Sequence, residues 1–207
     1  MDYREYSAFC INLDTRPDRW EQAQHEFTRV DWAITRWPAS PPSARPLLSP
    51  GAAGCLESHR RVWRHCLEQQ LPAVFVFEDD AVLAPRFKDI FGPIAAQLPE
   101  NWEIWHLHSA HARVQAVSAD LVAYLGSGWG SHGYAIRASA CEKLLAHELT
   151  QPVDVQLTGA YLQLGGAPLG TAMRTALCLQ RGDDTDIPIN AQIAYWRQLR
   201  AQTFRNE

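Results

Sequence analysis

The stretch that decides the fold is Ala73-Val-Phe-Val-Phe-Glu-Asp-Asp80, in which five apolar residues lead directly into three carboxylates. A short, continuously apolar run rich in valine and phenylalanine predicts a β-strand that is buried on both faces, as in parallel sheets. A polar cluster directly after such a strand lies at its carboxyl end, where open α/β sheets bind their ligands. The stretch therefore predicts an α/β fold with a candidate site at residues 78–80.

Predicted helices and strands alternate on both sides of this strand. Ser7–Leu13 is another apolar run and predicts a strand, after which Trp20, Ala23 and Phe27 repeat at helical spacing. Glu57–Gln70 predicts a longer amphipathic helix. The other predicted elements are strands at 32–37, 103–108, 134–136 and 176–180 and a helix at 138–147. This alternation predicts a mixed, mainly parallel sheet flanked by helices.

The end of the chain is predicted to form a segment of its own. A single α/β domain over residues 1–187 is followed by an amphipathic helix over residues 188–207. The helix is indicated by apolar residues at helical spacing, namely Ile189, Ile193, Trp196 and Leu199. Its three arginines are few for contact with an anionic membrane, so docking on the core or on a second subunit is the favoured interpretation and a membrane surface is the alternative.

Composition limits the classes of function. The 207 residues are 46% hydrophobic and carry a net charge of −4, which favours one globular domain and argues against a nucleic-acid partner. No apolar run is long enough to span a membrane, and Met1–Glu5 lacks the start of a signal peptide, so we expect a cytoplasmic protein. The five cysteines contain no CxxC pair and are interpreted as small buried hydrophobes rather than as a zinc site or a disulfide framework.

Glu78, Asp79 and Asp80 place three carboxylates side by side, which is costly unless a positive group offsets them. Mg²⁺ or Mn²⁺ is the natural partner, because these hard cations prefer oxygen ligands. If the alternation of an extended chain continues past the strand, Glu78 and Asp80 face the cation and Asp79 faces away. Taken alone, however, the cluster is more typical of a solvated acidic turn at a strand end.

Polar residues near the other predicted strands are candidates for the same site. Asn12 and Arg19 follow the first strand, where an arginine suits phosphate binding, although an exposed arginine is the commoner outcome. His59 shares a helix face with apolar residues, which is typical of a histidine at the edge of the core, and Ser58 suits a helix start. The glycines of Gly130–Gly133 permit close approach to a ligand, or form an ordinary turn.

Three further features are open to more than one interpretation. Asp154 is a candidate general base, although an isolated loop aspartate seldom has that role. His106, His108 and His111 do not have the spacing of a zinc-protease motif and are interpreted as strand and loop residues. The segment 38–54, rich in proline, serine, alanine and glycine, is either a functional loop or a disordered one.

Four segments, taken in order, form a pattern that none of them carries alone. They are Ile11-Asn12-Leu13 with Arg19; Leu48-Ser49-Pro50-Gly51 with Gly54-Cys55, Ser58-His59 and Trp63; Val76–Ala81; and Gly126-Ser127 with His132–Ile136. The pattern resembles the family 25 glycosyltransferases, which include bacterial lipopolysaccharide galactosyltransferases and collagen galactosyltransferase domains. Pro152-Val153-Asp154 resembles a fifth block, whereas Gly51-Ala52-Ala53 stands where the family often has an acidic residue.

The resemblance implies a GT-A-type fold and the transfer of a sugar, galactose in the first instance, from a UDP-sugar to an acceptor hydroxyl with the help of Mn²⁺ or Mg²⁺. It implies inversion at the anomeric carbon and an acceptor such as lipopolysaccharide or another glycan. The residues assigned on this basis are Asp154 and Asp79 as catalytic carboxylates, Glu78 and Asp80 as metal ligands, and Asn12, Leu13, Arg19, Ser58, His59, His132 and Gly133 as nucleotide-binding residues.

Two other classes of function are compatible with these residues. A metal-dependent nucleotidyltransferase or diphosphohydrolase would use a similar acidic α/β site, although the sequence contains neither a P-loop nor a G-x-G-x-x-G fingerprint. A non-catalytic relative would bind the nucleotide-sugar without turning it over. Transfer to an acceptor, release of free sugar, or binding alone would distinguish the three classes.

Overall fold

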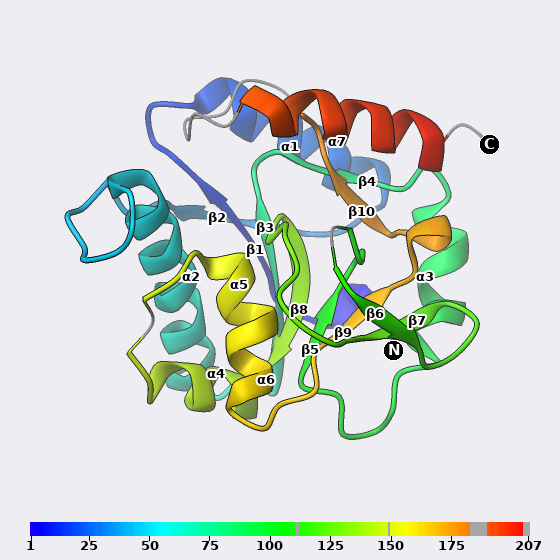
Figure 1. The fold of residues 1–207 in the computed structure, drawn as a ribbon. Coiled ribbons are helices and arrows are strands. Elements are labelled where there is room, and N and C mark those ends of the chain that lie inside the picture. Colours follow the sequence, from blue (N-terminus) through cyan, green and yellow to red (C-terminus); the bar gives the residue numbers. More distant parts are fainter. Residues whose placement is uncertain (111, 149, 183–189, 205–207) are drawn as a thin grey trace.

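The computed structural model describes residues 1–110, 112–148, 150–182 and 190–204 (Figure 1). The strands are β1 (Ala8–Asn12), β2 (Thr35–Pro38), β3 (Ala73–Glu78), β4 (Ala81–Leu83), β5 (Ile104–His106), β6 (Val114–Ala116), β7 (Leu121–Tyr124), β8 (Gly133–Arg137), β9 (Leu169–Thr171) and β10 (Cys178–Gln180). The helices are α1 (Pro17–Arg29), α2 (Pro50–Glu68), α3 (Phe87–Ala95), α4 (Ala138–Leu145), α5 (Val153–Val155), α6 (Tyr161–Gln163) and α7 (Asn190–Thr203), with short 3₁₀ or π turns at η1 (Tyr3–Glu5), η2 (Gln156–Ala160) and η3 (Met173–Thr175).

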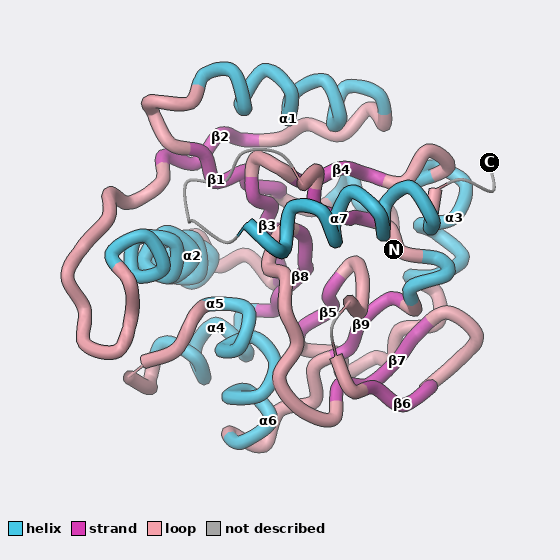
Figure 2. Tube along the Cα trace, turned by 45° about the horizontal axis from the view of Figure 1, so that its top comes forward, coloured by secondary structure: helices cyan, strands magenta, loops and turns pink. Residues whose placement is uncertain are grey.

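Eight of the described strands form one mixed sheet in the order β2-β1-β3-β8-β5-β9-β7-β6 (Figure 2). The pairings of β1 with β2, β1 with β3, and β5 with β9 are parallel, whereas β8 and β7 run against their neighbours. Within this sheet only β7 and β8 oppose the common direction, so the sheet is mainly parallel, as predicted. A separate pair, β10 with β4, lies outside it.

Strand β3 lies inside the sheet and is buried along its apolar length, which confirms the prediction of a strand covered on both faces. Phe75 and Phe77 join a core that includes side chains of α1 and α3. Val74 and Val76 point the other way, into a second core that includes side chains of α2, α4, α5 and α6. The alternation of one strand thus builds a three-layer molecule with helices on both sides of the sheet (Figure 1).

Helix α2 begins at Pro50, well before the predicted start at Glu57. Ser49 caps it by accepting a hydrogen bond from Ala52 N at 3.3 Å, and Pro50 occupies the first turn, where its missing N–H has no helical partner to lose. The glycines of this turn have low helix propensity, which made the segment resemble a loop. The functional or disordered loop predicted for 38–54 is therefore shorter, and its last residues belong to a helix.

Several other elements depart from the prediction. The second strand begins at Thr35 rather than Trp32, because Trp32 turns into the aromatic core, where its ring lies 4.8 Å from that of Phe75. The elements β4, α3, β6, β7 and β9 have no counterpart in the prediction. Residues 153–163, for which the sequence predicts no helix or strand, form a helical segment whose middle, Gln156–Ala160, is a single π turn.

Helix α7 lies against the described domain rather than apart from it. Leu199 and Phe204 pack on a small cluster of Ala110, Ala176 and Leu179. This packing favours docking on the core for the described part of the helix. The acidic turn 183–186, residues 187–189 and Arg205 lie outside the described residues, as do the side chains of Ile193 and Trp196, so the domain boundary at 187 stays a prediction. None of the described helices is both long and apolar enough to cross a bilayer.

Candidate active site

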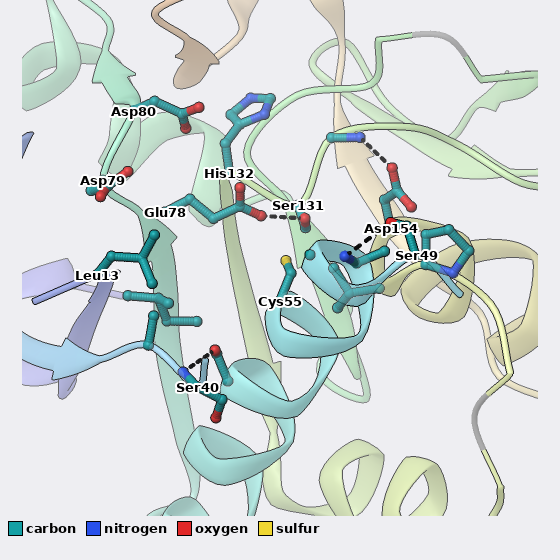
Figure 3. Close-up of a pocket in the computed structure, with 18 of the residues that line it drawn as sticks. Leu13, Ser40, Ser49, Cys55, Glu78, Asp79, Asp80, Ser131, His132 and Asp154 are labelled. Atoms are coloured by element: carbon teal, nitrogen blue, oxygen red, sulfur yellow. Dashed lines mark hydrogen bonds between the residues drawn. The ribbon is translucent and has the colours of Figure 1, made fainter. Parts of the chain in front are cut away.

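A pocket of about 420 Å³ opens where β1 and β3 end (Figure 3). The site residues predicted from the sequence that line it are Asn12, Leu13, Arg19, Ser58, Glu78, Asp79, Asp80, His132 and Asp154. These residues come from six separate stretches of the chain, which the sheet and α2 bring together. The carboxyl ends of neighbouring parallel strands meet at one edge, so the pocket lies where an α/β sheet binds its ligands.

Arg19 neutralises two of the three carboxylates. Its Nη2 lies 3.0 Å from Asp79 Oδ1 and 3.2 Å from Asp80 Oδ2, and all three side chains are about 10% exposed. Asn12 Nδ2 donates to the other oxygen of Asp79 at 2.7 Å. The expected alternation of the three acids is therefore wrong: β3 ends at Glu78, and the turn that follows directs Asp79 and Asp80 to the same guanidinium.

Asp80 is a buried carboxylate with one oxygen to spare. Gln180 Nε2 donates to its Oδ2 at 2.7 Å, whereas Oδ1 is buried without a hydrogen-bond partner. Burial, together with the charge of Glu78, raises the pKa of Asp80 to about 6 despite the opposing effect of Arg19. A buried carboxylate oxygen without a partner is costly, and a hard cation is the group that would offset that cost.

Glu78 turns away from Arg19 toward α2 and β8. Its Oε1 accepts a short hydrogen bond from Ser131 Oγ and lies 3.5 Å from His59 Nε2 (Figure 3). Burial opposes ionisation of Glu78, but the interactions with His59 and Ser131 outweigh it and hold the pKa of Glu78 below its ordinary value. Glu78 is therefore ionised at neutral pH.

His59 does not line the pocket but lies next to Glu78, which does. It is fully buried, and its Nδ1 shares a hydrogen bond of 2.8 Å with Tyr134 Oη, an oxygen that accepts from Trp63 Nε1 at 2.9 Å. The sequence left open whether His59 belongs to the core edge or to the site. It lies in the core of α2, and its free ring edge reaches Glu78.

The other predicted nucleotide-binding residues have varied surroundings. Ser58 Oγ donates to Gly54 O at 2.7 Å and accepts from Ser40 N at 2.8 Å. It thereby connects the loop that follows β2 to helix α2. The buried His132 lies at the pocket wall, and burial lowers its pKa to about 3, which keeps it neutral. Gly133 packs instead against Cys178, whose Sγ would lie 2.8 Å from an added Cβ. Gly133 is thus a packing position at the start of β8.

Asp154 lines the pocket on the side opposite Leu13 (Figure 3). Its Oδ1 accepts from Val155 N at 2.8 Å and its Oδ2 accepts from Gly130 N at 3.4 Å, a weak contact (Figure 3). Burial raises the pKa of Asp154 to about 6, although these backbone donors act in the opposite direction. A carboxylate with a pKa just below neutrality is ionised at pH 7 and still basic enough to accept a proton.

The structure also brings residues to the pocket that the sequence did not assign. Cys55, interpreted as a buried hydrophobe, is half-buried, and its sulfur points toward Glu78 (Figure 3). Trp129 is exposed at the pocket wall, and Gln180 reaches Asp80 from β10. The one local signal was Cys55 itself, which is four residues before His59 on the same helix. His106 ends β5 and His108 follows it, as interpreted, while His111 lies outside the described residues.

Gly54 lets the loop after β2 approach α2, and its replacement tests this packing. An added Cβ would lie 2.8 Å from Pro41 O and 2.9 Å from Ser40 O, both backbone atoms. We expect Gly54→Ala to lower the free energy of unfolding by about 1–3 kcal/mol in urea denaturation, because overpacking outweighs the gain in helix propensity. Gly92→Ala in α3 is the matched control, since nothing lies within 4 Å of its added Cβ, and equal destabilisation of both variants would contradict the expectation.

Comparison with solved structures defines the class of fold. The chain superimposes with a TM-score of 0.52 on a crystal structure of a glycosyltransferase involved in the glycosylation of the major capsid of PBCV-1. The match covers 92% of this chain and 97% of that one at 8% identity, so it concerns the fold alone. With its mainly parallel mixed sheet and flanking helices, the protein has a GT-A-type fold, as expected from the resemblance.

Sequence comparison then relates the chain to a family. A model described as "Glycosyltransferase family 25 (LPS biosynthesis protein)" matches residues 33–128. The lacto-N-neotetraose biosynthesis glycosyltransferase LgtB of Neisseria meningitidis serogroup B is 27% identical, over 67% of this chain and 56% of its own. A glycosyltransferase 25 family member of Drosophila pseudoobscura pseudoobscura is 23% identical, over 70% of this chain and 28% of its own. Over these residues the chain is similar to glycosyltransferase family 25, and the alignments span little more than half of one relative and less than a third of the other.

Proposed function

We propose that this protein is a metal-assisted glycosyltransferase that moves a sugar, galactose in the first instance, from a UDP-sugar to an acceptor hydroxyl with inversion. The match of residues 33–128 to the family model supports a sugar donor and an acceptor. The name of the LgtB relative and the family description support a glycan of the lipopolysaccharide type as the acceptor, and a cytoplasmic location belongs to the same proposal.

The observation that carries this proposal is the unpartnered Oδ1 of the buried Asp80 at the pocket wall. Arg19 and Gln180 already engage Oδ2, so the remaining lone pairs of Oδ1 suit a divalent cation. Glu78 and Asp80 are the residues that would hold it. When bound, Mn²⁺ or Mg²⁺ would neutralise the charge that develops on the diphosphate as the nucleotide leaves.

The chain's own residues supply the rest of the reaction. Asn12, Leu13 and Arg19 form the wall where β1 ends, and we assign the nucleotide to this side of the pocket. Arg19 also holds Asp79 and Asp80 in place, which limits repulsion among the acids before a cation binds. Asp79, bound by Asn12 and Arg19, stays a predicted catalytic carboxylate whose contacts are to the protein.

Asp154 is the proposed general base. It lies across the pocket from the residues assigned to the nucleotide, and its raised pKa of about 6 suits the removal of a proton from an acceptor hydroxyl at neutral pH. The hydroxyl oxygen would attack the anomeric carbon as its proton passes to Asp154. One displacement of this kind inverts the configuration of that carbon.

A thermal-shift screen tests the donor and the metal together. We expect UDP-sugars with Mn²⁺ to raise the melting temperature more than either alone, because each ligand completes the other's site. Stabilisation by UDP-galactose at 100 times its dissociation constant corresponds to about 2.7 kcal/mol. Equal shifts with ADP- and UDP-sugars, or no dependence on the cation, would contradict the proposal. Product analysis then separates transfer to an acceptor from release of free sugar.

A further inference from the structure

Cys55, His59 and Glu78 form a cluster of three side chains that can each offer one ligand atom to a metal. The three ligand atoms lie within 4.8 Å of one another. The set combines a thiol, an imidazole and a carboxylate, which differs in chemistry from the oxygen ligands assigned to a hard cation at Asp80. The thiolate is a soft ligand and the imidazole a borderline one, so the pair favours Zn²⁺ or a similar thiophilic cation over Mg²⁺ or Mn²⁺, and zinc also accepts the carboxylate as a third ligand.

The positions of the three residues in the fold explain why they meet. Cys55 and His59 are four residues apart on α2, so their side chains share one face of the helix. This is the spacing at which a helix presents two ligands to zinc in metalloproteases. Glu78, the last residue of β3, provides the third ligand atom, and Figure 3 shows that Cys55 and Glu78 point toward one another.

His59 provides an independent indication of a ligand. It is 0% exposed, and its Nε2 is buried without a hydrogen-bond partner. The nearest acceptor, Glu78 Oε1, is 3.5 Å away, which is long for a hydrogen bond. Nitrogen and oxygen ligands about 2.0–2.1 Å from a tetrahedral zinc are about 3.4 Å apart, so the observed separation suits two ligands of one ion.

Hydrogen bonds to neighbouring side chains orient both His59 and Glu78. Tyr134 Oη lies 2.8 Å from His59 Nδ1 and can accept a hydrogen bond from it, while Trp63 Nε1 donates to the same oxygen at 2.9 Å. When a metal binds, Nε2 loses any proton that it shares with Glu78 and Nδ1 donates to Tyr134, which is the form of histidine that binds a metal. Ser131 orients the carboxylate of Glu78 from its other side.

We propose that Cys55, His59 and Glu78 bind Zn²⁺, or a cation of that class, with the fourth position open to the pocket. Binding replaces the thiol proton of Cys55, which passes to solvent, by a sulfur–metal bond, and the thiolate and Glu78 together balance the charge of the ion. The site is separate from the hard-cation site at Asp80 but shares Glu78 with it. Zinc bound here would therefore compete with a cation-bound donor.

Cobalt spectroscopy tests this site without any nucleotide-sugar, so its outcome does not depend on the proposed transferase activity. We expect the chelator-treated protein to bind one equivalent of Co²⁺ with a thiolate-to-cobalt charge-transfer band, and added Zn²⁺ to abolish the band. In Cys55→Ala the band should be lost. Cys178→Ala, which removes a buried thiol outside the cluster, is the matched control and should keep it.

A second set of variants distinguishes a loss of metal binding from a loss of folding. His59→Gln should weaken Zn²⁺ binding at least about tenfold in competition with a chromogenic chelator, and Tyr134→Phe should weaken it about 10-fold, as loss of a supporting hydrogen bond does. Each variant's circular dichroism and melting curve report whether it is folded. A wild-type protein that binds no Co²⁺ through sulfur, or a charge-transfer band that persists in folded Cys55→Ala, would overturn the proposal.

Discussion

Asp80→Asn is expected to reduce the transfer rate about 100- to 1,000-fold and, at the same time, to stabilise the fold. The rate falls because an amide replaces the carboxylate proposed to hold the cation. Stability rises because Asp80 has a pKa of about 6 in the fold against an ordinary 3.8, so the folded protein disfavours the ionised form. The contribution of Asp80 to wild-type stability should therefore fall as the pH rises from about 4 to about 6, and the amide avoids this loss.

The size of the gain follows from the same shift. A difference of two pKa units corresponds to on the order of 2–3 kcal/mol at pH 7, or a melting temperature several degrees higher in a chain of this length. Activity with UDP-sugar and Mn²⁺, together with calorimetry at pH 4 and pH 7, measures both effects. Asp89→Asn, at a carboxylate whose side chain is 67% exposed, is the matched control for loss of one charge. Wild-type turnover in Asp80→Asn would refute the metal assignment.

The sheet was the most predictable part of the molecule. The pattern of β3 alone indicates burial on both faces, because Phe75 and Phe77 serve one core while Val74 and Val76 serve the other. The short strands β6 and β7 lack such a pattern. β6 is an edge strand that pairs with the nearby β7, and β7 joins the sheet by pairing with β9, which is distant in sequence. Local propensity likewise misplaced the start of α2, which a serine cap and a proline determine.

The sequence predicts which residues form the site better than it predicts how their side chains are oriented. The pattern of family motifs brought Asn12, Arg19 and the three acids together, and the structure places them at one pocket. The orientation of Asp79 and Asp80 was not predictable, because it depends on whether the chain stays extended after Glu78. That choice depends on Arg19, which lies far away in sequence and engages both carboxylates only once α1 has packed.

Asp154→Asn is expected to lower the transfer rate about 100- to 10,000-fold, because an amide cannot accept the proton of the attacking hydroxyl. In the wild-type enzyme, the rate should rise with pH through about 6, where the buried Asp154 ionises, and then level off. The residual activity of the variant should lack this rise. Donor-induced stabilisation should survive, because the nucleotide is assigned to the opposite wall of the pocket.

The acid limb of this pH profile has a second candidate, since Asp80 also has a pKa of about 6. The two can be separated by varying Mn²⁺. A bound cation favours the ionised form of Asp80, so a limb that belongs to Asp80 moves to lower pH as Mn²⁺ rises, whereas a limb that belongs to a base outside the ligand set stays in place. We expect the acid limb to stay at the same pH as the Mn²⁺ concentration rises. A limb that moves with Mn²⁺, or that persists in Asp154→Asn, would transfer the role of general base to another group.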